Sequence, residues 1–483
     1  MLTEDDDLIR AQDIPERMQL ATSSLSQSST LSLHQNLTEA DLDDAAMWVT
    51  VRLSPRKTRD FFSPDGPYNM YREPLVMAVT YTLRFLFVQE FEVPYVWTHK
   101  RDYISYFNPQ EMRTRVQLIS LAELWRIYSL GQKYRSLADR RNTLALSYTR
   151  LGVEDEYFEQ TIRPKIDSVE VVTDATEWLT MKYKLKKQDA FDFQFHDDED
   201  QAETRKRKTP SRISAYEVAK KSIVSKLADV RNCRSTFMHI FIFYQGFGIK
   251  PHEVVYNFVA QENVHFVDDQ ELNPIAFAEQ FTDPDATVAQ TPEEVLRRAR
   301  MILATELGKD PLLRQAIRDL FKTDALISVL PTERGMAKID DHHPYFVSIT
   351  MSSSRSYFHL SPQQNFKYLH HKSITQMMDT PQFLHILAAE AELLVTVSMF
   401  LTNDAKSKFE RRLNDAFASD RYSDTARAWN EERSRVIQET LEQHLIPVGI
   451  KWAREWLREE VEDTLAAHCG NVLREVFFNV LPL

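Results

Sequence analysis

One stretch, residues 74–137, restricts the fold more than any other part of the chain. Over residues 75–90 the apolar side chains recur every three or four positions and cover more than one face, which is typical of a buried helix. Pro94 interrupts this pattern, because proline cannot continue a helix and pushes the residue before it toward an extended backbone. Ser120 and Glu123 then form a capping-box pattern that opens a second helix. Two buried helices joined through a proline-broken turn predict a helix-turn-helix module.

Side chains within this module can be assigned to its inside or its turn. Tyr95, Val96 and Trp97 are expected to anchor the turn after Pro94. In the second helix the helical spacing predicts an inward-facing set that consists of Leu121, Leu124, Trp125, Tyr128 and Leu137. Before the module, residues 56–66 are expected to form a loop with a basic spot at Arg56, Lys57 and Arg59.

Glycine is scarce in this chain, which has nine glycines among 483 residues, and none lies in a phosphate-cradling loop. This composition argues against a doubly wound nucleotide-binding fold. Hydrophobic residues make up 43% of the chain and follow helical spacing in most segments. We therefore expect an all-α protein, with a length that suits about three domains.

The chain carries 59 basic and 71 acidic residues, which gives a net charge of −12. This charge argues against binding to duplex DNA over the whole surface and suits a basic protein partner, although local basic patches could still contact phosphates. The longest apolar runs, residues 237–244 and 393–401, are far shorter than the ~20 residues that span a bilayer. Cys233 and Cys469 lie in helical patterns and are expected to be reduced core thiols.

Capping patterns place further helices in the second half of the chain. Thr291 with the following proline predicts a helix at 295–307, and Asp310 opens another at 312–321. Helical spacing returns over residues 422–480, where we expect a kink or break at Pro447. In that stretch the expected inward residues include Trp429, Val436 and Leu441, and the charged residues expected outside are Glu431, Glu432, Arg433 and Arg435.

Residues 188–212 differ from the rest in composition, because an acidic run is followed by four consecutive cations. The cations are Arg205, Lys206, Arg207 and Lys208. Two interpretations remain open. The segment can be a solvated loop, or it can serve as a nuclear-localisation or nucleic-acid-contacting segment, since such a run suits an acidic receptor groove or a row of phosphates.

Basic residues near the helix-turn-helix module are the candidates for a nucleic-acid contact. Long cations of this kind bind phosphates without reading bases. The alternative is ordinary ion pairing with the many acidic neighbours on the surface. The candidates are Arg84, Lys100, Arg101, Arg113, Arg115, Lys133, Arg135, Arg140 and Arg141.

Catalytic, cofactor-binding and metal-binding patterns are missing from the sequence. The histidine pairs at 342–343 and 370–371 lack a second ligand set at helical spacing. The calcium-like loop at 283–294 has Val288 where glycine is required. No serine or cysteine nucleophile is paired with a base in a recognisable motif. We therefore expect a protein that acts by binding, without enzymatic activity, cofactor or metal.

Three groups of residues together resemble one known family. They are Phe91–Trp97 with Lys100–Ile104 and Leu124–Ile127, residues 9–20 near the start, and Asp310–Gln315 with Asn365–Leu369. These stretches resemble the suppressor of Ty six family, which comprises eukaryotic transcription elongation factors and histone chaperones related to bacterial Tex. The resemblance implies the N-terminal part of the family's core, which is a nuclear, Tex-like helical scaffold. It also implies that RNA polymerase II, histones and nucleosomes are partners, with weak DNA or RNA contact and no membrane.

The resemblance also suggests how the chain is divided. The expected parts are an N-terminal helix and Ser-rich linker at 1–37, a helix-turn-helix domain at 38–150, a Tex-like helical region at 151–346, a disordered insert at 347–364 that could be a translated intron, and a helical region with a long connecting helix at 365–483. The histone-contacting leader, the RNase H-like domain and the later domains of the family would lie outside this chain. We therefore expect a fragment or a truncated gene model. The apolar tail at 477–483, which has no evident packing partner in the sequence, agrees with this expectation.

Two other functions stay open at this point. The chain could belong to a Tex-like nucleic-acid-processing protein whose missing RNase H-like domain is catalytic, which acidic residues arranged for two metals in that domain would reveal. It could also be a helical adaptor with no nucleic-acid role.

Overall fold

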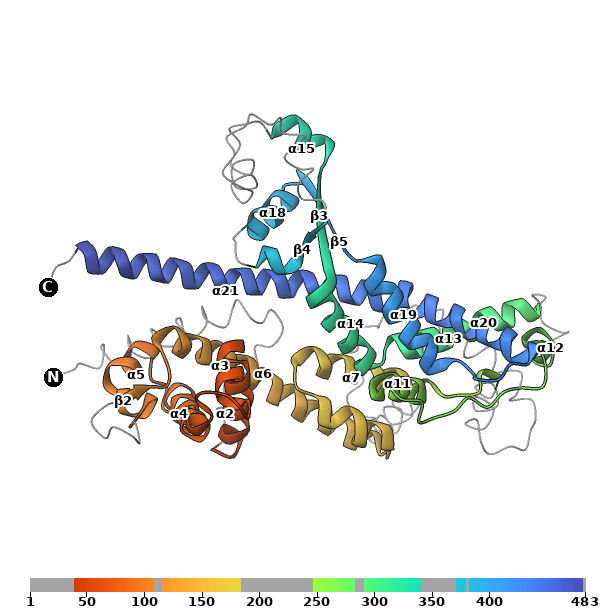
Figure 1. Ribbon diagram of the computed structural model, residues 1–483, viewed down its shortest axis with the longest axis horizontal. Coiled ribbons are helices and arrows are strands. Elements are labelled where there is room, and N and C mark those ends of the chain that lie inside the picture. The colour runs from red at the N-terminus through yellow and green to blue at the C-terminus, as the bar shows by residue number, and fades with distance from the viewer. Residues whose placement is uncertain are drawn as a thin grey trace, which may run out of the picture. The chain divides into compact units, whose positions relative to one another are not determined.

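The computed structural model describes residues 39–107, 115–183, 246–282, 291–339, 371–378 and 382–480. The chain divides into two compact units, with the boundary between Asp139 and Arg140. The described residues are mainly helical, which confirms the expected all-α class, but they also contain two small sheets that were not predicted (Figure 1). The segments expected at 1–37, 188–212 and 347–364 lie outside the described residues.

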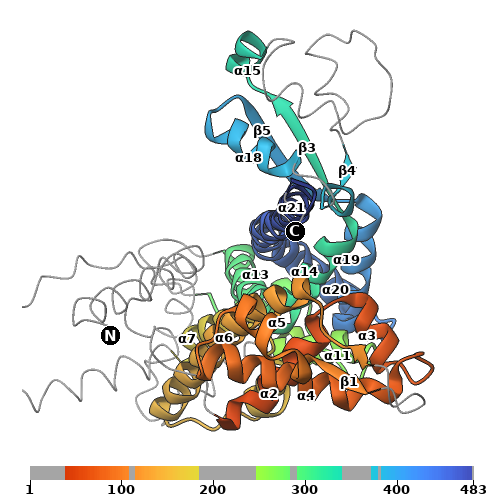
Figure 2. The same cartoon turned by 90° about the vertical axis from the view of Figure 1, so that its left-hand side faces the viewer.

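The first unit is a cluster of short helices, and its last element is the first part of a long helix (Figure 2). Its elements are α2 (Glu39–Arg52), α3 (Pro55–Phe62), η1 (Asn69–Tyr71), α4 (Arg72–Leu83), η2 (Arg84–Val88), α5 (Val93–His99), η3 (Arg101–Ile104), β1 (Ser105–Phe107), β2 (Arg115–Gln117) and the beginning of α6 (Leu121–Leu151). The strands β1 and β2 pair antiparallel.

Helix α4 lies at the centre of this unit and packs against α2. Leu75, Val79 and Leu83 of α4 have no exposed surface, which confirms the buried helix expected at 75–90. The helix changes to π geometry in η2. Helix α6 approaches η2 closely at Gly131, where any side chain would collide with the ring of Phe87. This contact explains why a glycine stands inside a long helix.

Pro94 begins a helix and does not start a turn. It lies in the first turn of α5, where the amide hydrogen that proline lacks would have no helical partner. The extended residue is Glu92, with φ −76° and ψ 151°, and Val93 already belongs to the helix. The chain does break before Pro94, but the expectation that residues 95–97 form a turn is wrong.

Two predictions for the neighbouring segments have different outcomes. The loop expected at 56–66 is wrong over most of its length, because α3 is helical and Ser54 caps it by accepting the Lys57 amide at 3.1 Å. The capping box is confirmed, since Glu123 accepts the Ser120 amide at 2.8 Å. Lys57 is not a free surface cation, because its ammonium group lies 2.9 Å from the Glu123 carboxylate. The ion pair joins α3 to the start of α6.

The second unit contains the remaining helices and a three-stranded sheet. Its described elements after α6 are η4 (Phe158–Ile162), η5 (Arg163–Lys165), α7 (Val169–Lys182), α11 (Pro251–Ala260), α12 (Pro274–Glu279), α13 (Pro292–Gly308), α14 (Pro311–Asp324), β3 (Ala325–Pro331), α15 (Glu333–Lys338), β4 (Lys372–Ser373), η7 (Ile374–Met377), α18 (Gln382–Ala391), β5 (Val395–Leu401), α19 (Asn403–Phe417), α20 (Asp424–Glu439), η8 (Thr440–Leu445) and α21 (Ile446–Val480). Its core lies where α13 packs on α20 and α14 packs on α21.

Both helices predicted from capping patterns are present in this unit. Thr291 accepts the Glu294 amide at 3.3 Å and begins α13. Asp310 accepts the amides of Leu312 and Leu313 at 2.9 and 3.4 Å and begins α14. Each helix carries proline at its first position, where the missing amide costs no hydrogen bond.

The sheet was missed by sequence reasoning. Strands β3 and β5 pair antiparallel from Ala325 opposite Leu401 to Pro331 opposite Val395, and β4 pairs with the other edge of β3. Ile327 and Val329 of β3 are fully buried. Short apolar runs fit a buried strand or a buried helix equally well, and periodicity alone does not separate the two.

The C-terminal part is helical from Asp424 to Val480. No break occurs at Pro447, because the π segment η8 lies directly before it and replaces the α-helical hydrogen bonds that proline would disturb. Of the expected inward residues, Trp429 and Leu441 are each 1% exposed, which confirms that face.

Two charged residues of α20 are buried, against expectation. Arg433 is 1% exposed and donates through Nε to the Phe247 carbonyl at 3.1 Å. Glu432 is 7% exposed and binds Arg300 of α13 at 2.5 Å. Long-range partners therefore draw both side chains inside.

Two further findings concern membrane-spanning helices and the cysteines. Within the ranges described above, every helix is too short or too polar to traverse a lipid bilayer. Cys469 is exposed on α21, so the expectation of a core thiol is wrong at this position. Cys233 lies outside the described residues.

Candidate nucleic-acid interface

Aromatic rings and cations are interleaved in the first unit where α5, η3 and the β1–β2 pair meet. We call this surface the aromatic–basic corner. It consists of Phe91, Tyr95, Trp97, Lys100, Arg101, Tyr103, Phe107 and Arg115. Three of the predicted nucleic-acid-binding cations are thus brought together by the fold.

Three rings of the corner are linked through contacts with one another and with the neighbouring ring of Phe85. Phe85 of η2 meets Tyr103 edge-on at 5.1 Å, and Phe91 lies 4.8 Å from Tyr95. Tyr95 in turn stacks on His99 at 4.5 Å with an interplanar angle of 14°. Tyr95 and Tyr103 remain 41% and 45% exposed. The rings of Tyr95 and Tyr103 are therefore held on one side by their neighbours and open to solvent on another.

Each of the three cations lies over an aromatic ring. The Lys100 ammonium is 5.5 Å from the Phe85 centroid, and the Arg101 guanidinium is 4.9 Å from that of Trp97. Arg115 lies 4.7 Å from the Phe107 ring and also forms an ion pair with Asp102. Cation–π contacts at these distances hold the charges of Lys100 and Arg101 in place without neutralising them, whereas Arg115 also has the exposed Asp102 as a partner.

The other predicted cations are placed differently. Arg84 and Arg135 are half-buried on η2 and α6. Arg140 donates to the Thr173 hydroxyl at 3.4 Å, and Arg141 donates to the Ile166 carbonyl, so both make contacts within the second unit. Arg113 and the run Arg205–Lys208 lie outside the described residues.

The exposed rings are what sequence reasoning missed. Trp125, expected to face inward, is 51% exposed, while Leu124 and Leu137 are fully buried as expected. Phe107 is 53% exposed on β1. The alternation of aromatic and basic residues over 95–107 was the available signal, because rings and cations side by side are typical of single-strand binding surfaces.

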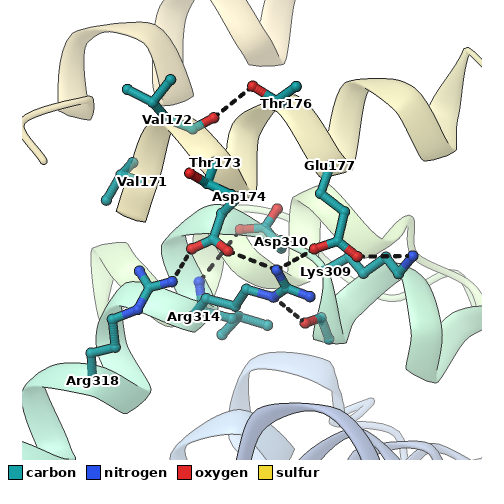
Figure 3. A network of polar contacts seen from close by, with 12 residues as sticks. Val171, Val172, Thr173, Asp174, Thr176, Glu177, Lys309, Asp310, Arg314 and Arg318 are labelled. Atoms are coloured by element: carbon teal, nitrogen blue, oxygen red, sulfur yellow. Dashed lines mark hydrogen bonds and ion pairs between the residues drawn. The ribbon is translucent and has the colours of Figure 1, made fainter. Parts of the chain in front are cut away.

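A second polar cluster lies in the second unit, where α7 packs against α14 (Figure 3). Arg314 binds one oxygen of Asp174 at 2.7 Å, and Arg318 binds the other. All three side chains belong to residues that are less than a tenth exposed. Arg314 also donates through Nε to the Gly308 carbonyl at 2.9 Å. One carboxylate thus holds two buried guanidinium groups from consecutive turns of α14.

Glu177 and Lys309 extend this cluster toward solvent (Figure 3). Arg314 lies 2.7 Å from the Glu177 carboxylate, which Lys309 approaches to 3.2 Å. Burial acts to raise the pKa of Glu177, but the hydrogen bond and charge of Arg314 outweigh it and lower that pKa. A carboxylate paired in this way is a poor proton acceptor. The cluster therefore fixes helices together, and in the described part of the chain no group of three metal-binding side chains gathers.

Asp310, the cap of α14, is fully buried and titrates abnormally. Burial raises its pKa to about 6, although the Leu312 amide and the Tyr157 hydroxyl stabilise the charged form. The Tyr157 hydroxyl donates to it at 3.0 Å. The folded chain therefore binds the Asp310 proton more tightly than the unfolded chain does.

Replacing Asp310 by asparagine tests this directly, since asparagine caps helices as well as aspartate. The ordinary pKa is 3.8 and the folded one about 6, so the wild type binds more protons folded than unfolded between these values. Its stability relative to the variant should fall as the pH rises from 4 to 6, by an amount on the order of 3 kcal/mol, and stay constant above. Urea unfolding of both proteins at several pH values measures this. Asp324→Asn, at the exposed end of the same helix, is the control, and a difference independent of pH would contradict the prediction.

Comparison with known proteins gives two family-model matches in different parts of the chain. A family model described as the helix-turn-helix DNA-binding domain of SPT6 matches residues 34–156. A second one, described as Tex central region-like, matches residues 269–467. The first covers the aromatic–basic corner, and the second covers most of the helical scaffold.

Similar proteins are named transcription elongation factor SPT6. That of Mycosarcoma maydis is 31% identical over 97% of this chain and 28% of its own length. Those of Schizosaccharomyces pombe and Neurospora crassa are 28% and 26% identical over 98% and 100% of the chain, and over 30% and 31% of their own lengths. The chain thus spans less than a third of these relatives. Two matching family models in the expected order and relatives along the whole chain confirm the resemblance, and the chain belongs to the SPT6 family of transcription elongation factors.

Proposed function

We propose that this chain is a non-catalytic binding region of a nuclear transcription elongation factor and histone chaperone that works with RNA polymerase II on nucleosomes. Family membership supports the elongation role, since the similar proteins carry that name. The net charge of −12 favours basic partners such as histones over a whole-surface nucleic-acid contact. Nucleic acid is then bound locally and weakly.

The observation that carries the nucleic-acid part of this proposal is the aromatic–basic corner. Cations bind phosphates of any sequence, and exposed rings accept bases by stacking. Tyr95, Tyr103 and Phe107 supply such rings next to Lys100 and Arg115. This combination suits a single strand, whose bases are free to stack.

A duplex is a poorer fit to the same surface. Reading a major groove requires a helix that projects its side chains between the phosphate rows. Helix α5 has only seven residues, and its Val93 and Val96 are buried. The corner therefore favours single-stranded over double-stranded nucleic acid.

Charge reversal at the corner tests the proposal. In the triple variant Lys100→Glu, Arg101→Glu and Arg115→Glu, binding to a fluorescein-labelled oligothymidylate should weaken at least ~tenfold, as measured by anisotropy in low salt. The slope of log affinity against log salt should also fall by about 2, since about 0.7 of an ion is released per single-strand phosphate contact.

A second triple variant provides the control. Arg56→Glu, Arg59→Glu and Arg126→Glu reverse the same number of charges at exposed positions of the first unit, outside the corner. This variant should bind nearly as well as the wild type. Equal weakening by both variants would mean that only net charge matters, and the corner would lose its assigned role.

A further inference from the structure

A surface pocket of about 390 Å³ opens in the second unit beside the last turns of α6. Its walls come from α6 on one side and from η4 and η5 on the other. Its lining includes Arg141, Ala145, Tyr148, Phe158 and Arg163. The volume falls within the range of small-molecule sites, which is roughly 300–1,000 Å³.

The pocket is positively charged. Arg141 and Arg163 line it, and its lining residues include no carboxylate. Arg141 gives one N–H to the Ile166 carbonyl and keeps its other donors. Arg163 is exposed and makes no hydrogen bond or ion pair with the described residues. Two guanidinium groups at one pocket suit an anion, and phosphate matches their planar donor geometry.

One wall of the pocket is aromatic and fixed in position. The rings of Tyr148 and Phe158 lie 4.6 Å apart at 35°. The Tyr148 hydroxyl accepts the Asp155 amide at 2.7 Å and donates to the Glu159 carboxylate at 3.0 Å. A ring held at both its face and its hydroxyl loses little entropy when a flat ligand stacks on it.

We propose that this pocket takes one nucleotide of a single nucleic-acid strand, with the base against Tyr148 and the phosphate at Arg141 and Arg163. The inference rests on the proposed nucleic-acid function but uses a site separate from the aromatic–basic corner. A small inorganic anion would contact only the two arginines. An acidic peptide side chain would also contact them but would leave the aromatic wall without a ligand contact. A nucleotide is the ligand class that uses both.

Filling the pocket without changing its charge is the sharpest test. Adenosine monophosphate is titrated into the full chain and followed by ligand-observed saturation-transfer NMR. Ala145→Trp places an indole in the pocket, and Ser147→Trp, exposed on the same helix but outside the lining, is its matched control. We expect Ala145→Trp to weaken binding at least ~tenfold and Ser147→Trp to leave it within about twofold.

A second pair of variants tests the phosphate contact. Arg163→Glu should weaken binding of the nucleotide at least ~tenfold, whereas Lys165→Glu, an exposed cation two residues away that does not line the pocket, should change it less than about threefold. Circular dichroism shows whether each variant is folded. Adenosine without phosphate should bind more weakly than the monophosphate to the wild type.

Three outcomes would overturn the proposal. If both Ala145→Trp and Arg163→Glu leave nucleotide binding unchanged, the nucleotide binds outside this pocket. Full displacement of the nucleotide by an equal concentration of inorganic phosphate makes the pocket a simple anion site. Oligothymidylate binding that falls in the triple variant of Lys100, Arg101 and Arg115 but not in the pocket variants rejects the pocket while leaving the proposed function intact.

Discussion

Replacing Asp174 by alanine is expected to lower the free energy of unfolding of the second unit by about 3–5 kcal/mol. The wild-type carboxylate holds Arg314 and Arg318, and both arginines are 7% exposed. Nε and Nη1 of Arg318 already have no hydrogen-bond partner in this structure. Removing the carboxylate therefore leaves a buried guanidinium group with no compensating contact.

The control for this variant is Glu177→Ala. The Glu177 side chain is 43% exposed, so losing its ion pair with Arg314 should cost less than about 1 kcal/mol. Native-state hydrogen exchange of the α14 amides measures both effects, since it reports on one region of a chain that has two units. Equal losses of unfolding free energy in the two variants would show that the buried ion pairs of Asp174 stabilise the protein no more than the exposed ion pair of Glu177 does.

Trp429→Ala is expected to cost a similar amount, about 3–5 kcal/mol, through the cavity it leaves. Trp429 is 1% exposed, and its ring meets Phe247 at 5.3 Å and Phe277 at 5.6 Å. Its indole N–H also donates to the Leu272 carbonyl at 2.9 Å. Both the apolar contacts and this hydrogen bond are lost in the variant.

Trp125→Ala is the matched control, because the same side chain is removed from a position that is 51% exposed. Its cost should stay below about 1 kcal/mol. Thermal unfolding followed by circular dichroism compares the two variants. A large loss for Trp125→Ala, or a small one for Trp429→Ala, would contradict the burial of these residues.

Features that depend on nearby residues could be predicted from the sequence. The caps at Ser120, Thr291 and Asp310 form because a side chain bonds to an amide two or three residues ahead. The buried helix α4 was recognised because apolar residues cover most of its circumference. In each case the information that decides the structure lies within about one or two turns of chain.

Features that depend on distant partners could not be predicted. Periodicity assigned both Trp125 and Trp429 to the inside. Only Trp429 is buried, because other aromatic side chains of the second unit pack around it. The pairing of β3 with β5 joins segments about 70 residues apart in the chain. A single sequence gives no signal for such a pairing, since the same apolar residues suit a helix.

The candidate site followed the same division. Lys100, Arg101 and Arg115 were recognised as cations near the module, because charge is visible in the sequence. The exposure of the rings beside them depends on how η3 and β1 pack, which the sequence does not give. Likewise, Asp174, the partner of Arg314 and Arg318, lies 140 and 144 residues away from them in the chain, so helical spacing could not reveal it.

The π segment η8 sets the rotational phase of the 35-residue helix that follows it. A π turn holds about one residue more than an α turn, and each residue of an α-helix advances roughly 100° around the axis. If all the residues of η8 were instead wound as regular α-helix, the extra residue would rotate every later side chain by about that angle. Ala453, Leu457 and Val461, which now lie buried, would then turn away from the core. The π geometry of this single turn thus determines which face of the long helix packs against the rest of the second unit.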